Sequence, residues 1–118
     1  MNERKVNILG TEYTVKERSQ KEDEKLNDCD GYTDWTTREI IVRKEREQDL
    51  GVKSLRNIDA YIRLVIRHEI VHAFLFESGL DGSAVNICVW TQNEEMVDWF
   101  AIQGQKIYKA WQEADALD

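Results

Sequence analysis

Two histidines and a glutamate near the middle of the chain have the spacing of a metal-dependent hydrolase. His68 and His72 are four residues apart, and Glu69 follows the first of them directly. On a helix, residues four apart lie on one face, a turn apart, so both imidazoles can reach one metal ion. Zinc suits this pair, because two neutral imidazoles leave room for one more protein ligand and a water. Glu69 is placed to take the proton of that water as general base.

This geometry requires a helix, and the surrounding residues predict one. Apolar residues recur at helical spacing over about residues 55–77, with Ser54 as the expected N-cap and Gly79 as the stop. The apolar positions cover more than one face of the helix and are Ile58, Ile62, Val65, Ile66, Ala73, Leu75 and Phe76. We therefore expect this helix to be central to the fold. The two histidines are the only ones in the protein, which argues against a coincidental pairing.

A second predicted helix, over about residues 93–114, supplies carboxylates. Glu94 and Asp98 are four residues apart, so a helix points both the same way. One can bind zinc while the other accepts the far N–H of a ligating histidine, which fixes the tautomer of that ring. We favour Glu94 as the third ligand and Asp98 as the residue that orients a histidine. Glu95 is the rival ligand, but its partner four residues on is Trp99.

The last helix is expected to pack through one apolar face. The residues expected on that face are Met96, Val97, Phe100, Ile107, Tyr108 and Trp111. The four tryptophans, Trp35 among them, could shape a ligand groove, but core packing is the simpler assignment. The acidic end, residues 113–118, predicts a frayed terminus, with an inhibitory tail that folds over the zinc as the alternative.

The first half of the chain predicts a small antiparallel sheet of about three strands. Residues 6–9 and 13–15 flank Gly10-Thr11, which is typical of a tight hairpin turn. The polar residues 17–30 predict a loop or a short exposed helix, and residues 36–42 are rich in β-branched side chains and predict a third strand. These elements predict an α+β fold in which the sheet packs on the active-site helix and on the glutamate helix.

Length and composition indicate a single domain over residues 1–118. The 118 residues are 42% hydrophobic, with no internal repeat. A net charge of −7 argues against nucleic acid or an anionic membrane as partner, because both need a basic surface. No window approaches a membrane span, and no apolar signal core is present. Cys29 and Cys88 are too few for a disulfide framework, so we expect buried free thiols in a soluble, cytoplasmic protein.

Two motifs resemble those of the gluzincin metallopeptidases, of which the thermolysin group is the best known. That family has His-Glu-x-x-His on one helix and, some twenty or more residues later, a glutamate ligand within Asn-Glu-x-x-x-Asp-x-Phe and a small residue. The matching segments here are His68-Glu69-x-x-His72 and Asn93-Glu94-x-x-x-Asp98-x-Phe100-Ala101. At this length the chain looks most like the minimal, single-domain gluzincins of archaea, bacteria and phages, which have a zincin-like fold.

The resemblance implies a peptidase with a role for each motif residue. His68, His72 and Glu94 would hold Zn²⁺, and Asp98 would orient a ligating histidine. Glu69 would deprotonate the attacking water and pass the proton to the leaving amine. The substrate would be a peptide or a protein.

Two further features of the family have less definite counterparts. In gluzincins an edge strand ahead of the active-site helix pairs with the extended substrate, a role that would fall to the strand from Arg38 to Val42. An ordinary edge strand is the alternative for this stretch. Larger gluzincins also add a His or Tyr that binds the oxyanion, and the candidates left open here are Tyr32, Tyr61, Tyr108 and Arg67.

The sequence therefore predicts a zinc metallopeptidase, with three alternative functions. One is a zinc-binding regulatory or interaction protein of phage or mobile-element origin. The intact Glu69 argues against it, because a structural zinc site needs a closed fourth position and no base. A second is a dedicated protease that cleaves one partner, such as a repressor, and not generic peptides. A small α+β domain with a coincidental motif is a third, which the double motif disfavours.

Overall fold

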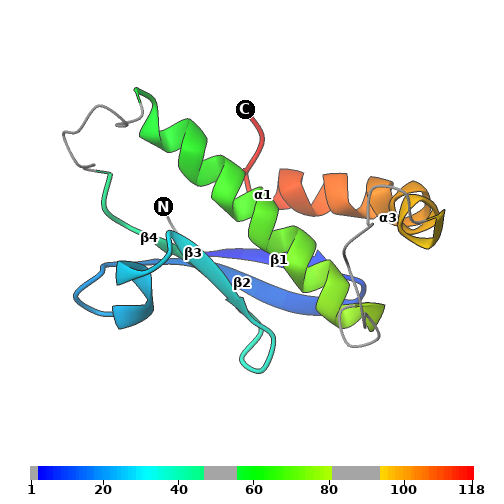
Figure 1. The fold of residues 1–118 in the computed structure, drawn as a ribbon, viewed down its shortest axis with the longest axis horizontal. Helices are drawn as coiled ribbons and strands as arrows, with labels where there is room; N and C mark the ends of the chain where they lie inside the picture. Colours follow the sequence, from blue (N-terminus) through cyan, green and yellow to red (C-terminus); the bar gives the residue numbers. More distant parts are fainter. Residues whose placement is uncertain (1–2, 47–55, 81–93) are drawn as a thin grey trace.

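The computed structural model describes residues 3–46, 56–80 and 94–118 of the chain, without the side chains of residues 94, 97, 98 and 101. Its elements in chain order are β1 (Arg4–Ile8), β2 (Thr11–Arg18), the 3₁₀ helix η1 (Glu24–Asn27), β3 (Gly31–Asp34), β4 (Glu39–Arg43), α1 (Ile58–Glu77) and α3 (Glu94–Glu113). Both helices lie on the same side of the sheet (Figure 1). The fold belongs to the α+β class, as the sequence predicted.

The sheet has four strands in the order β1-β2-β4-β3, one more than expected. β1 and β2 form the predicted hairpin around Leu9 and Gly10, which both have positive φ. β3 and β4 form a second antiparallel hairpin. The hairpins join through β2 and β4, which run parallel with Val15 opposite Ile40. The prediction of a purely antiparallel sheet was wrong. After β2 the chain passes through η1 to β3 at the edge of the sheet, and β4 then returns between β3 and β2, parallel to β2.

β4 lies inside the sheet, so the expectation of an edge strand from Arg38 to Val42 was wrong. Ile40 and Val42 belong to the main core, and Ile41, which points to the opposite face, is only 1% exposed. A strand buried on both faces has such a continuous apolar run. The edge strands are β1 and β3, and the sequence did not predict β3.

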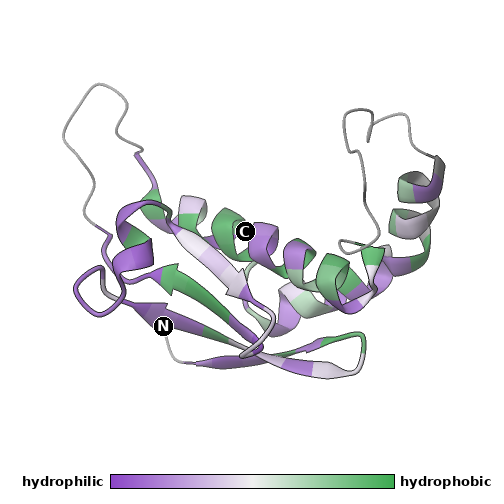
Figure 2. Cartoon of the chain, turned by 60° about the horizontal axis from the view of Figure 1, so that its bottom comes forward, coloured by the Kyte–Doolittle hydropathy of each residue, from purple (hydrophilic) through white to green (hydrophobic). Residues whose placement is uncertain are grey.

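The main core lies between the sheet and α1, and α3 packs against β1 and α1. Apolar residues lie on β4 and along α1 (Figure 2). Among the most deeply buried members of the core are Val6, Ile8, Tyr13, Val15, Ile40, Val42, Ile70, Ala73 and Phe74. Burying a side chain of this kind stabilises the fold by about 1.5–3 kcal/mol. The core therefore fixes α1 firmly on the sheet.

α1 lies within the predicted span but begins at a different cap. The side chain of Asn57 accepts a hydrogen bond from the main-chain N of Ala60 at 3.1 Å, so Asn57 is the N-cap. Ser54, the expected cap, lies outside the described residues. At the other end Gly79 has a φ of 80°, the left-handed conformation that commonly ends a helix. The predicted stop is confirmed.

α3 has nearly the predicted bounds, but its packing differs from the expectation. Met96 and Ile107 are buried, whereas Phe100 and Tyr108 are largely exposed. The residues after α3 are held and not frayed, because Arg67 of α1 donates a hydrogen bond to the main-chain O of Ala116 at 2.7 Å. Within the described ranges, neither helix is long and apolar enough to cross a membrane.

Candidate metal centre

The two histidines of the motif lie together on α1. Nε2 of His68 is 3.1 Å from Nε2 of His72. Two imidazoles that share a tetrahedral zinc ion hold their nitrogens about 3.3 Å apart, which follows from Zn–N distances of about 2.0–2.1 Å. The same separation allows an N–H···N hydrogen bond between the rings. The pair thus fits the metal that the motif implies, with both donor nitrogens directed at one point.

The carboxylates expected to complete the metal site belong to α3. Glu94 is the first residue of α3, and Asp98 lies one turn later. The structure describes their backbone only, so their side chains and their predicted roles lie outside the described residues. Glu95, the rival ligand, is exposed. Among the side chains that are described, no group of three His, Cys, Asp or Glu residues is placed to hold a metal ion.

Glu69 is the one buried polar or charged residue in the described part of the chain, with 7% of its surface exposed. The hydroxyl oxygen of Thr33 lies 2.9 Å from the main-chain O of Glu69 and 3.0 Å from its Oε1. Because a hydroxyl has a single proton, it donates to one of these oxygens at a time. The contact holds the carboxylate on the β3 side of α1. Sequence reasoning missed Thr33, since β3 itself was not predicted.

β3 approaches α1 this closely because residue 31 has no side chain. A Cβ at Gly31 would lie 2.7 Å from Cγ1 of Val65 and 3.0 Å from the main-chain O of Ile41. The first distance is shorter than real Cβ contacts and the second is tighter than most of them, so the neighbouring atoms would have to shift. Gly31 therefore sets the separation at which Thr33 reaches Glu69.

An open cavity of about 340 Å³ adjoins His68 and Glu69. Its other lining residues come from the start of β3 and from the preceding part of α1, and are Cys29, Asp30, Gly31, Tyr61, Leu64 and Val65. The Tyr61 hydroxyl donates to Oδ2 of Asp30 at 2.5 Å, and this bond raises the pKa of Tyr61 above its ordinary value. Cys29 is exposed, contrary to the expectation of a buried thiol, and Cys88 lies outside the described residues.

Tyr61 is the one oxyanion candidate that lines this cavity. Tyr32 donates its hydroxyl to Asp23, and burial together with that bond raises the pKa of Tyr32 to about 12. Arg67 is bound to the chain after α3, and Tyr108 lies exposed on α3. The structure therefore places Tyr61 beside the motif and engages Tyr32 and Arg67 elsewhere.

Comparisons with profiles of protein families, with curated proteins and with solved structures gave no match. The class of this protein is therefore defined by its fold and by the geometry of its site. It is an α+β protein in which one helix carries two converging imidazoles and a buried carboxylate, beside an open cavity.

Proposed function

We propose that this protein is a cytoplasmic, zinc-dependent peptidase of the gluzincin type. His68, His72 and Glu94 hold the metal, and Asp98 orients a ligating histidine. The observation that carries the proposal is the 3.1 Å separation of the two Nε2 atoms beside the buried Glu69. When bound, zinc supplies a Lewis acid for the peptide carbonyl and lowers the pKa of a bound water.

Glu69 acts as general base and then as general acid. Its carboxylate takes a proton from the attacking water and later gives that proton to the amine nitrogen that leaves as the peptide bond breaks. Thr33 keeps the carboxylate in place before the substrate arrives, which lowers the cost of reaching the reactive arrangement. A regulatory zinc site has no use for a base held in this way, so Glu69 favours an enzyme.

The substrate lies along β3 as an added strand. In the described residues no strand pairs with the outer edge of β3, so its N–H and C=O groups can bond to an extended peptide. We assign the pairing with substrate to β3 and not to the stretch from Arg38 to Val42, because both edges of β4 are already paired, one with β2 and the other with β3. The contact of Thr33 with Glu69 then brings the peptide next to the base.

Metal content with matched variants tests the site. The purified protein should hold one zinc ion per chain, and His72→Ala and Glu94→Ala should lose it. Glu69→Gln should keep the metal, because Glu69 is not a ligand. Glu95→Ala is the matched control for Glu94→Ala, since it removes the neighbouring carboxylate of the same helix. Equal zinc loss in Glu94→Ala and Glu95→Ala would contradict the assignment of Glu94.

Cleavage of a quenched peptide library then tests the activity. We expect the zinc-loaded protein to cleave, and Glu69→Gln to lower the rate at least about a hundredfold, which is typical for loss of a general base. Bound zinc without any cleavage favours a regulatory protein or a protease dedicated to one partner. Failure to bind zinc even after reconstitution overturns the proposal.

A further inference from the structure

Apolar side chains flank the proposed catalytic residues along α1. Leu64, His68, His72 and Phe76 follow one another at intervals of four residues, so they form one stripe on the helix. Leu64 is 51% exposed. The ring of Phe76 lies 6.5 Å from the ring of His72. The histidine pair thus has an apolar neighbour on each side.

β3 runs beside this stripe and keeps in register with it. Gly31 is close to Val65, and two residues later Thr33 reaches Glu69, four residues further along the helix. Two strand residues advance about 6.6 Å and four helix residues about 6.0 Å, so the two elements stay aligned. A chain that pairs with β3 would therefore run in the same direction as this stripe of α1 or directly against it.

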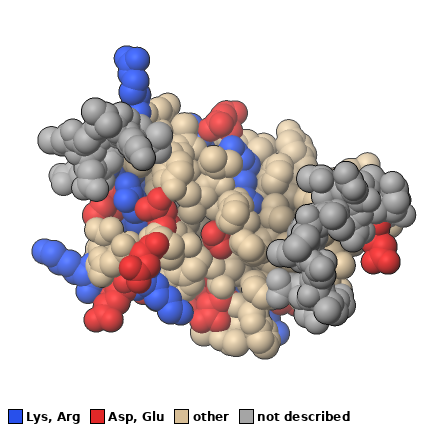
Figure 3. Space-filling view, viewed as in Figure 1, with Lys and Arg blue, Asp and Glu red and all other residues tan. Residues whose placement is uncertain are grey.

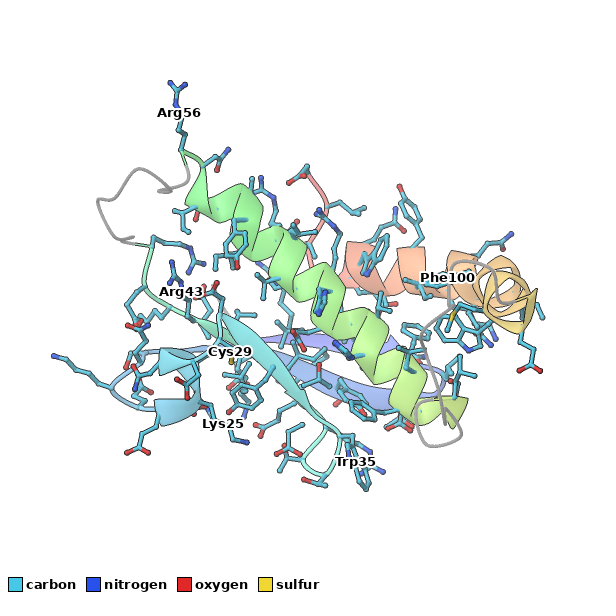
Figure 4. The ribbon with its side chains drawn as sticks, in the orientation of Figure 1. Lys25, Cys29, Trp35, Arg43, Arg56 and Phe100 are labelled. Carbon is cyan, nitrogen blue, oxygen red and sulfur yellow. The ribbon has the colours of Figure 1, made fainter. Side chains whose placement is uncertain are left out.

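Two apolar contact points lie at opposite ends of β3. The cavity beside Leu64 is at its beginning. Just after its end, Trp35 is 56% exposed, with its ring 6.5 Å from that of Phe76. Cys29, which lines the cavity, and Trp35 mark these two ends in Figure 4. The expectation of Trp35 as a core residue was wrong, and its exposure leaves an aromatic surface beside the histidines.

The surface between these points carries little charge. On the face seen in Figure 3, charged side chains gather mainly over the η1 and β2 end, and only a few separate ones interrupt the uncharged surface in the middle. Asp30, which lines the cavity, is paired with Arg43 at 3.1 Å and with Tyr61. The net charge of −7 disfavours acidic ligands. Charge complementarity therefore favours a neutral or basic partner here.

We propose that the substrate is an extended, non-acidic polypeptide segment with an apolar side chain at each end of the stretch that lies along β3. This rests on the proposed peptidase function. An aliphatic side chain enters the cavity beside Leu64, and an aromatic one packs on Trp35 and Phe76. The helix from Leu64 to Phe76 spans about 18 Å, the length of about five to six extended residues. Because side chains of a strand alternate, the two apolar residues are four or six positions apart.

The test uses zinc-loaded Glu69→Gln protein, which should bind peptides without cleaving them. The probes are fluorescein-labelled peptides of Ser, Thr and Gln that carry one Leu and one Phe, four or six positions apart, in either order. We expect Trp35→Ala and Leu64→Ser each to raise Kd about tenfold in fluorescence anisotropy. Ile102→Ser is the matched control, because Ile102 is an exposed apolar residue of α3, and it should leave Kd unchanged. Thermal denaturation checks that these exposed substitutions leave the fold intact.

A double-mutant cycle assigns each peptide side chain to its end of β3. Replacing the peptide Phe by Ser should weaken binding to the parent protein but not further weaken binding to Trp35→Ala. Replacing the peptide Leu by Ser should likewise weaken binding to the parent protein but not further weaken binding to Leu64→Ser. Peptide and protein changes that simply add would overturn the assignment.

The outcomes separate this proposal from the peptidase function. Equal Kd values for Trp35→Ala, Leu64→Ser and the control overturn it, and so does the absence of binding to every peptide at about 1 mM. Binding that depends on Trp35 and Leu64, with no cleavage by the parent protein, supports the specificity surface and contradicts the peptidase. Cleavage that is indifferent to both substitutions supports the peptidase and overturns the specificity surface.

Discussion

The hydroxyl of Thr33 on β3 contacts Glu69 on α1 twice, at 2.9 Å from the main-chain O and 3.0 Å from Oε1, although the two residues are 36 positions apart in the chain. This contact connects the edge of the sheet to the proposed general base. The position of the proposed base and the position of the proposed peptide are therefore set by the same strand.

Thr33→Val keeps the shape of the side chain but removes its hydroxyl, so it should free the Glu69 carboxylate to rotate. We expect kcat for peptide cleavage to fall about tenfold or more, since a hydrogen bond to a charged group is worth about 1.5–3 kcal/mol. KM should change less than about threefold, because the peptide contacts remain. Thr33→Ser restores the hydroxyl and should recover most of the rate. A Val variant as active as the Ser variant would show that Thr33 does not position the base.

Gly31→Ala should force β3 away from α1. The added Cβ would lie 2.7 Å from Cγ1 of Val65 and 3.0 Å from the main-chain O of Ile41. Overpacking of this kind costs about 1–3 kcal/mol in the free energy of unfolding, which urea denaturation measures. Val65→Ala removes one of the two clashes, so the double variant should be more stable than the sum of the single effects predicts. Strict additivity would contradict this explanation.

Tyr13→Phe should loosen the attachment of α1 to β2. The Tyr13 side chain is fully buried, and its hydroxyl lies 2.8 Å from Oε1 of Glu77 in the last turn of α1. Burial and this bond raise the pKa of Tyr13 above its ordinary value, so the stabilisation is present below pH 10 and is lost above it. Loss of the hydroxyl should cost about 1–3 kcal/mol. Calorimetry measures the Tm of this variant and of Glu77→Gln, which keeps an acceptor and should lose less stability. An unchanged Tm for Tyr13→Phe would contradict the role of the bond.

Glu39 should make the fold sensitive to acid. Its Oε2 lies 2.6 Å from Nζ of Lys16 and 3.7 Å from Nη2 of Arg18, and the bond to Lys16 holds the pKa of Glu39 below its ordinary value of 4.5. A carboxyl whose pKa is lower in the folded protein stabilises it above the unfolded pKa and loses this effect as the pH falls through the folded pKa.

The free energy of unfolding should therefore decrease as the pH falls from about 5 through the folded-state pKa of Glu39. Glu39→Gln should reduce that decrease by up to about 1 kcal/mol, the range for a partly exposed ion pair. Urea denaturation of both proteins across this interval gives the difference. The same pH dependence in parent and variant would assign the acid sensitivity to other carboxyls.

Elements defined by local patterns could be predicted from the sequence. The apolar spacing that predicted a helix over residues 55–77 is matched by Ile58–Glu77, and the hairpin turn at Gly10 is also correct. The order of the strands could not be predicted in this way. β3 is only four residues long and is stabilised by its pairing with β4, which no local pattern reveals. The apolar run Ile40-Ile41-Val42 did carry the signal of an interior strand.

In the candidate site, too, some features follow from local sequence patterns and others from the tertiary arrangement. The shared face of His68 and His72 follows from helix geometry alone, so their spacing was sufficient to predict it. The contact of Thr33 with Glu69 joins distant segments and required the three-dimensional arrangement. The exposure of Trp35 likewise depends on the end of a strand that was not predicted. Glu94 lies on α3 as expected, and its role as a ligand stays a prediction.

The parallel junction of the two hairpins bears on when the proposed peptidase site forms during folding. Each hairpin closes over a few residues, whereas β2 and β4 bring Val15 opposite Ile40, 25 residues later. Closing a longer loop costs more chain entropy, and non-local pairing slows folding. Since α1 rests on strands of both hairpins, its place opposite Thr33 is fixed only once they have joined. The proposed base would thus be positioned late in folding, and a newly made chain would gain the proposed activity only once its sheet is complete.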